Sequence, residues 1–479
     1  MWIEIPNLLN HIIYPVISFK REQPQILTFA KKLPMILFNR IFLMTALSGF
    51  HLFLSLSVRA SEPDSVRMQW FSENRLGIFI HWGIYSVRGT AESWAFHNRA
   101  MPYDEYMEQI TGFTAREYTP EQWASLIRKS GAGYAVITSK HHDGVALWDT
   151  KANDLSIPAR SPARKDVLSP FVEALRKEGL KAGIYFSLLD WSHPDYPGFL
   201  KDSARYSVKE DPLRWEKFLE FNNRQLEELQ HLVRPDLWWF DGDWEHSAEE
   251  WKASSIRKKL LAWNPETLIN GRLQGFGDYE TPEQNFPVTR PVHPYWELCM
   301  TTNDSWGWVP GDTQWKTPYE IISIYADVAG MGGNLLLDIG PREDGSIPEP
   351  QVNILTELGT WNHKHREALL GTRAGLPCGH FYGPSTLSKD GQTLYLFLSG
   401  NPRGEVVIKG LFNRIQQISV LGENTPVSWK IVGKISWSPV PGLVYISLPD
   451  ALNDPYMNIL KVELDGPLKL YSGKGGLSL

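Results

Sequence analysis

Short apolar runs alternate with amphipathic helical patterns over residues 70–370, and this alternation limits the possible folds more than any other feature of the chain. It predicts βα units around a parallel sheet, because parallel strands need a long crossover between them. The expected strands are residues 77–86, 134–142, 181–191, 237–242, 267–272, 295–301 and 334–340. The expected helices include residues 121–130, 166–178, 213–232 and 249–263.

Seven or eight such units favour a (β/α)8-like barrel over an open doubly wound sheet. No glycine-rich turn follows the first expected strand, where a dinucleotide-binding sheet needs one for the phosphates. A helical pattern over residues 350–370 ends the region. We therefore expect an α/β catalytic barrel over residues 61–374.

The alternation of strand and helix patterns ends after the predicted helix over residues 350–370. Short alternating runs follow one another without helices between them, separated by turn residues such as Asn401-Pro402 and Pro441-Gly442. This arrangement is typical of an antiparallel β-sandwich. We expect a C-terminal β-sandwich domain over residues 375–479.

Residues 1–60 have the features of a secretory signal region. An uncharged apolar run over residues 41–57 follows basic residues and leads to short side chains, so we expect cleavage after Ala60. Met35 or Met44 would give a leader of ordinary length. The alternative is a membrane anchor. We expect an exported protein, periplasmic, lysosome-like or extracellular, without a stable membrane span after cleavage.

Charge and cysteine content exclude some classes of protein. The net charge is −6, so no basic excess is available to bind a phosphate backbone, and we expect no nucleic-acid partner. Two cysteines, Cys299 and Cys378, are too few for a disulfide framework. The chain has 20 tryptophans, and their flat rings can fill a core or stack on sugar rings.

Polar side chains gather where the expected strands end, which is where barrel enzymes carry their catalytic groups. His81, residues 140–143 and Arg272 lie at such ends. Asp241 is the strongest candidate, because it follows an apolar run, residues 237–240, that aims it into a desolvated site. Such a carboxylate must be paired or functional.

Buried carboxylates, histidines and tryptophans together suit a site for a pyranose ring, and cleavage of a glycosidic bond needs two carboxyl groups. The competing chemistry is metal-assisted hydrolysis, with His81, His141, His142 and Asp143 as ligands. Adjacent His141 and His142 should point to opposite faces of a strand, and none of these residues belongs to an H-x-H or H-E-x-x-H motif. We therefore expect no metal and no other cofactor.

Seven motifs together resemble the retaining α-L-fucosidases of glycoside hydrolase family 29. They are GIFIHWGIYSV, SKHHDGVALWDT, GIYFSLLDW, LWWFDGDWE, INGR, YWELCMTTNDSWGW and NLLLDIGPREDGSIP. The resemblance extends from Met68 to Ile347 and implies a catalytic barrel followed by a C-terminal β-sandwich.

The resemblance also implies roles for individual residues. Asp241 matches the family's nucleophile, and Arg272 would help to keep it ionised. The residues that match sugar contacts of the family are His81, Glu92, Trp94, His141, His142, Tyr185, Trp239 and Arg272. The match at Trp94 contains one extra residue.

Two glutamates compete for the role of general acid and base. We prefer Glu297, because its neighbours Trp296 and Leu298 are apolar and would raise the pKa of a carboxyl group, as an acid catalyst needs. Glu283 is the alternative, and Glu280 is a third candidate.

We expect an exo-acting α-L-fucosidase that hydrolyses terminal fucosyl residues of oligosaccharides or glycoconjugates by double displacement. Its two carboxyl groups should lie about 5–5.5 Å apart, the separation of retaining enzymes. A catalytically silent glycan-binding protein and a metal-dependent hydrolase are the alternatives. The linkage preference, acceptance of α-L-galactosides and the oligomeric state leave no trace in the sequence.

Overall fold

The computed structural model describes residues 66–471 except 401, 424 and 451, together with residue 473. The predicted signal region and its cleavage position lie outside the described residues. Within the described part of the chain, no helix is both long and apolar enough to cross a membrane.

A parallel seven-stranded sheet forms the first part of the structure, in the order β5-β4-β3-β2-β1-β7-β6. The strands are β1 (Leu76–Ile80), β2 (Tyr134–Lys140), β3 (Lys181–Ser187), β4 (Leu237–Asp241), β5 (Leu268–Ile269), β6 (Glu297–Thr301) and β7 (Asn334–Ile339). Six lie within the predicted segments, and β1 begins one residue before the predicted segment 77–86. Their residues are almost all buried, as expected of a parallel sheet covered on both faces.

An irregular segment, residues 278–284, lies between the edge strands β5 and β6. The backbone N–H of Asp278 donates to the carbonyl of Ile269 (2.7 Å), and the N–H of Cys299 donates to the carbonyl of Pro282 (3.1 Å). The segment therefore hydrogen-bonds to both edges of the curved sheet. The predicted barrel is confirmed, with this segment in the eighth position in place of a regular strand.

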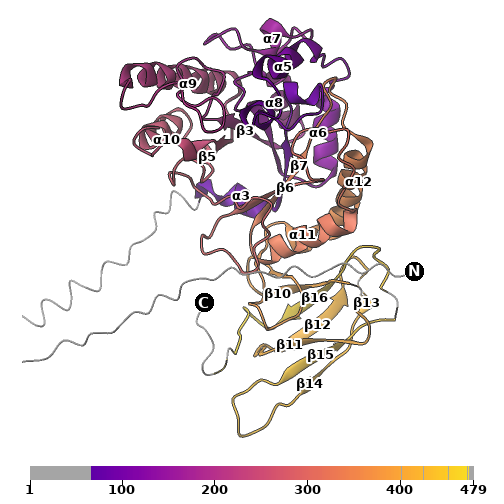
Figure 1. Cartoon of the computed structure of the whole chain (residues 1–479). Helices are drawn as coiled ribbons and strands as arrows, with labels where there is room; N and C mark the ends of the chain where they lie inside the picture. Colours follow the sequence, from indigo (N-terminus) through magenta and orange to yellow (C-terminus); the bar gives the residue numbers. More distant parts are fainter. Residues whose placement is uncertain (1–65, 401, 424, 451, 472, 474–479) are drawn as a thin grey trace, which may run out of the picture. The chain divides into compact units, whose positions relative to one another are not determined.

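Helices connect and cover the strands, as Figure 1 shows for the longer ones. The longer helices are α6 (Pro120–Lys129), α8 (Ser169–Lys177), α9 (Pro212–Val233), α10 (Ala253–Trp263), α11 (Pro318–Gly330) and α12 (Glu349–Lys364). The short helices are α3 (Gln69–Glu73), α4 (Trp94–His97), α5 (Tyr103–Glu108), α7 (Ile157–Arg160) and α13 (Arg366–Leu369). Several begin with proline, whose missing N–H costs nothing in the first turn.

Side chains alternate between the barrel interior and the layer beneath the helices. Phe79, Tyr185 and Trp239 belong to the interior cluster, whereas Ile78 and Trp238 belong to the larger core outside it. Towards the carboxyl end of each strand, every second side chain continues this interior set. The same alternation therefore aims the last residues of the strands at the mouth of the barrel.

The C-terminal region forms two antiparallel sheets around a separate apolar core. The larger has the order β13-β12-β16-β10-β9-β8, and the smaller has the order β11-β15-β14. Their strands are β8 (Arg373–Ala374), β9 (Ser385–Leu387), β10 (Thr393–Leu398), β11 (Glu405–Lys409), β12 (Ile415–Val420), β13 (Thr425–Pro426), β14 (Trp429–Val432), β15 (Leu443–Ser447) and β16 (Asn458–Leu464).

Candidate active site

A pocket of about 270 Å³ opens at the carboxyl ends of the barrel strands. Its volume lies just below the usual range for drug-sized ligands, so it suits a single small ring. Its walls combine aromatic rings with titratable groups. The lining residues are Phe79, His81, Glu92, Trp94, His141, Tyr185, Trp239, Asp241, Trp244, Arg272, Glu283 and Trp306.

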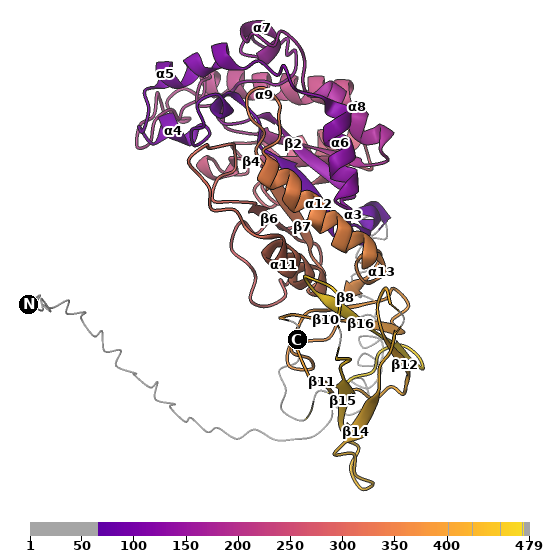
Figure 2. The ribbon, with the colours of Figure 1, turned by 90° about the vertical axis from the view of Figure 1, so that its right-hand side faces the viewer.

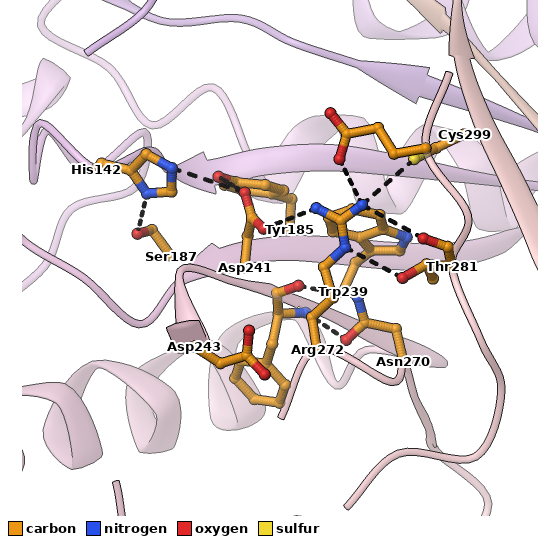
Figure 3. A network of polar contacts seen from close by, with 12 residues as sticks. His142, Tyr185, Ser187, Trp239, Asp241, Asp243, Asn270, Arg272, Thr281 and Cys299 are labelled. Atoms are coloured by element: carbon orange, nitrogen blue, oxygen red, sulfur yellow. Dashed lines mark hydrogen bonds and ion pairs between the residues drawn. The ribbon is translucent and has the colours of Figure 1, made fainter. Parts of the chain in front are cut away.

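Asp241 ends β4, and its carboxylate forms part of the pocket wall. One oxygen, Oδ1, accepts a hydrogen bond from Arg272 Nη1 (2.9 Å), and Oδ2 accepts one from the Tyr185 hydroxyl (2.9 Å). Asn270 holds the strand end by accepting from the N–H of Phe240 and donating to its carbonyl, both at 2.9 Å. The position of the carboxylate is therefore set by two neighbouring strands and a cation (Figure 3).

Arg272 joins Asp241 to a second carboxylate. Its Nη2 donates to Glu283 Oε2 at 2.5 Å, and its guanidinium group lies 4.5 Å from the ring centre of Trp239. Its Nε donates to the Thr281 hydroxyl (3.1 Å), which belongs to the same irregular segment as Glu283. The guanidinium group of Arg272 thus holds two carboxylates close to one another. The Asp241 side chain is largely buried, and the Glu283 side chain is 40% exposed.

Each of the three histidines has one ring nitrogen held by the protein. The Nδ1 atoms of His81, His141 and His142 contact Asp338 Oδ1 (2.7 Å), Ser93 Oγ (2.5 Å) and Ser187 Oγ (2.6 Å). Burial holds the pKa of each imidazole well below its usual value. The rings are therefore neutral near pH 7. The Nε2 atoms of His81 and His141 are left to contact a ligand, and Nε2 of His142 lies 3.7 Å from Asp241 Oδ2.

The structure corrects one expectation about the paired histidines. His141 and His142 do not point to opposite faces, since their ring centres lie 4.3 Å apart. The reason is that β2 ends at Lys140, so the alternation of a strand no longer applies to them. Among the described residues, no three His, Cys, Asp or Glu side chains are grouped as metal ligands.

Glu92 and Trp94 both reach the pocket, as expected. Glu92 accepts a hydrogen bond from the N–H of Gly307 (2.7 Å), and burial raises the pKa of its carboxyl group to about 7. Trp94 lies edge-on to His142 and nearly parallel to Trp244, whose side chain is half exposed at the pocket mouth.

Glu297, our preferred acid and base, does not line the pocket. It is fully buried, and it accepts hydrogen bonds from the Trp239 indole (2.9 Å) and the Tyr134 hydroxyl (2.5 Å). The physical reason is its place in the strand: Glu297 begins β6, whereas the pocket lies at the carboxyl ends. Glu280 is exposed and also lies outside the pocket wall. Of the three candidates, only Glu283 lines the pocket.

Three lining residues escaped our sequence-based assignment of the site: Phe79, Trp244 and Trp306. Phe79 could have been found, because it belongs to a predicted strand and precedes His81 by two residues, the spacing that puts two side chains of an extended chain on one face. Trp306 packs 4.9 Å from His81, measured between ring centres, but it belongs to a loop after β6 whose path has no periodic signal.

Comparisons with known proteins agree with this geometry. The sequence model of the family described as alpha-L-fucosidase matches residues 58–367. The tissue alpha-L-fucosidase of Homo sapiens is 30% identical over 417 residues, which cover 79% of this chain and 84% of the human protein. The corresponding enzyme of Macaca fascicularis is 31% identical over 64% of this chain and 69% of its own length.

Solved structures are similar as well. Alpha-L-fucosidase isoenzyme 1 from Paenibacillus thiaminolyticus matches with a TM-score of 0.76 and 28% identity, covering 84% of this chain and 100% of its own. A GH29 alpha-L-fucosidase from Bacteroides thetaiotaomicron matches with a TM-score of 0.74 and 26% identity, covering 83% and 96%. That structure is a covalent intermediate with 2-fluoro-fucosyl fluoride, trapped with a glutamate-to-glutamine mutant.

Proposed function

This chain belongs to the α-L-fucosidase family, glycoside hydrolase family 29, and from that premise we propose how its pocket works as a retaining α-L-fucosidase. Asp241 is the nucleophile and Glu283 is the general acid and base. The substrate is a terminal α-L-fucosyl residue of an oligosaccharide or glycoconjugate. The observation that carries the assignment is the placement of Asp241 and Glu283 on one pocket wall, joined through Arg272.

In the first step, the Asp241 carboxylate attacks the anomeric carbon while Glu283 protonates the departing glycosidic oxygen. The bond to the leaving group breaks, and a fucosyl ester forms on Asp241. In the second step, Glu283 takes a proton from a water molecule while the water oxygen attacks the anomeric carbon. The ester bond to Asp241 breaks, which releases fucose and restores the free carboxylate. Two inversions leave the anomeric configuration unchanged.

The rest of the pocket suits the sugar itself. Neutral His81 and His141 can bond hydroxyl groups without competing for the proton that Glu283 transfers. Trp239 and Trp306 offer flat apolar faces for the ring and its methyl group. Glu297 lies behind Trp239 and holds its indole in place, which is a positioning role.

Leaving-group dependence tests this assignment of the acid. Glu283→Gln should lower kcat/KM for fucosyl oligosaccharides by about 10²–10⁴-fold, the usual contribution of a general acid. It should affect the first step of aryl fucosides with acidic leaving groups far less, because these need no protonation. Glu297→Gln is the matched variant, and it should change both substrate classes by the same factor. A larger effect on oligosaccharides in Glu297→Gln than in Glu283→Gln would return the role to Glu297.

The proposal includes export. It is supported by the apolar run over residues 41–57 and the short side chains before Ser61. Sequencing of the amino terminus of the exported protein should find Ser61 first.

A further inference from the structure

A second pocket, of about 150 Å³, lies at the amino-terminal end of the barrel, opposite the active site. Arg75 directly precedes β1, Trp296 directly precedes β6, and Asn334 begins β7. Arg373 of β8 and Arg290 of the return loop, residues 285–294, complete the polar part of its wall. Figure 2 shows α3, which carries other lining residues, at this end of the sheet.

Arg75 is a buried cation at this end of the barrel. It is 4% exposed, and among the described residues no ion pair is formed by its guanidinium group. Its Nη1 donates to the carbonyl of Gly332 (2.7 Å) and its Nη2 to that of Thr372. Its Nε is buried and finds no acceptor in the part of the chain that the structure describes. Burial, together with the nearby charge of Arg290, lowers the pKa of Arg75 to about 10. A buried arginine is ordinarily paired, so this one is poised for an anion.

The remaining polar groups of the wall add donors without adding a negative charge. No aspartate or glutamate lines the pocket among the residues described, whereas Arg290 and Arg373 bring two further guanidinium groups. The indole Nε1 of Trp296 is buried and has no hydrogen-bond partner within the described ranges. Arg373 has an acidic neighbour, Asp390, which is in solvent and does not line the pocket.

We propose that this pocket binds a tetrahedral oxoanion, a phosphate or sulfate group, between Arg75 and Arg290. Donors approach from three separate elements: the residue before β1, the return loop and β8. Such an arrangement fits an anion with acceptor oxygens on several sides better than a planar carboxylate. The site is distinct from the fucose pocket, and the proposal does not depend on the proposed catalytic roles.

Calorimetric titration of the whole protein tests the proposal, with sodium sulfate and sodium phosphate against sodium chloride of matched ionic strength. We expect saturable binding at one site for sulfate or phosphate and none for chloride. Arg290→Gln should weaken binding about tenfold, the effect of losing one charge-assisted contact. Arg290 is exposed, so its replacement should leave folding intact, and Arg373→Gln provides a second variant. Arg128→Gln removes an exposed arginine that does not line the pocket, and this variant should bind like the wild type.

The oxoanion could be a free inorganic ion or the sulfate group of a glycan, and titration with galactose 6-sulfate distinguishes these two sources. Tighter binding than inorganic sulfate, lost in Arg290→Gln, would indicate a sulfated glycan, and equal or weaker binding would indicate the free ion. Absence of saturable binding for all three probes would overturn the proposal. Binding that is unchanged in both Arg290→Gln and Arg373→Gln would overturn it too, because the anion would then occupy another site.

Discussion

Asp241 and Glu297 are both carboxylates of the barrel, but they lie at opposite ends of their strands and meet different partners. Asp241 ends β4 and faces the guanidinium of Arg272 at the open pocket. Glu297 begins β6 and is surrounded by neutral donors, the Tyr134 hydroxyl and the Trp239 indole. The first environment suits a nucleophile that meets substrate. The second suits a buried anchor for an aromatic ring.

Replacement of Asp241 by alanine should remove the nucleophile while leaving the fold intact. We expect kcat for an aryl α-L-fucoside to fall by about a thousandfold or more. Added azide should restore turnover and yield the fucosyl azide of inverted configuration, because the small anion occupies the space of the carboxylate. Asp243→Asn is the control, since Asp243 does not line the pocket. Full activity of Asp241→Ala would place the nucleophile elsewhere.

Glu297 should make folding stability depend on pH. Burial raises the pKa of its carboxyl group from about 4.5 to about 7. The folded protein therefore holds this proton more tightly than the unfolded chain, and the resulting stability is complete below about pH 4.5 and lost as the pH rises through 7. Relative to Glu297→Gln, the wild type should lose on the order of 3 kcal/mol of unfolding free energy across this window.

Urea unfolding at several pH values measures this difference, and the other buried carboxyl groups cancel because both proteins contain them. Glu280→Gln, a change of an exposed glutamate three residues before Glu283, is the control substitution. A difference between the wild type and Glu297→Gln that stays constant from pH 4.5 to 7.5 would contradict the raised pKa.

At the scale of elements, the periodic segments were predictable and the irregular ones were not. The predicted helix over residues 213–232 is α9, Pro212–Val233, and the predicted strand over residues 334–340 is β7, Asn334–Ile339. By contrast, β5 contains only Leu268–Ile269, because residues 278–284 take over its pairing with β6. That segment contains Pro282 and has no regular alternation, so only its hydrogen bonds reveal it.

Helix α11 has a capping box that should contribute measurable stability. The Thr317 hydroxyl accepts from the N–H of Glu320 (3.3 Å), and the Glu320 carboxylate accepts from the N–H of Thr317 (2.6 Å). Thr317→Ala should lower the free energy of unfolding by about 1 kcal/mol without changing kcat. Thr356→Ala, within α12, removes an exposed threonine that is not a cap and should cost little or nothing. Equal losses in the two variants would contradict the capping role.

At the scale of the whole molecule, barrel and sandwich share part of one core. Phe397 of β10 and Ile459 of β16 belong to the cluster that includes the barrel helices. The Trp361 indole of α12 donates to the carbonyl of Met457 (2.9 Å). The described residues accordingly belong to one compact unit. The sandwich therefore packs against the barrel through shared buried side chains.

Phe397→Ala should destabilise the catalytic domain although the ring lies far along the chain from the pocket residues. Its side chain is fully buried, so truncation should cost about 3–5 kcal/mol. Activity and near-ultraviolet circular dichroism should then be lost together at lower urea concentrations. Tyr382→Ala, a change of an 81% exposed aromatic on the same domain, should leave both unchanged. Activity of Phe397→Ala that persists to wild-type urea concentrations would mean that the two domains unfold independently.

The order of strands and helices, the change to antiparallel strands and the place of Asp241 at a strand end could all be read from residue patterns. These features are local, because burial imposes a period of two or about 3.6 residues on each element and leaves polar residues at its ends. The choice between Glu283 and Glu297 was not local. It depended on which end of β6 carries Glu297, and on an irregular segment that brings Glu283 to Arg272. Strand direction, register and hydrogen bonds between distant segments exist only in the folded chain. The apolar neighbours of Glu297 therefore favoured it in the sequence, and only the tertiary structure showed that Glu283 is the one that lines the pocket.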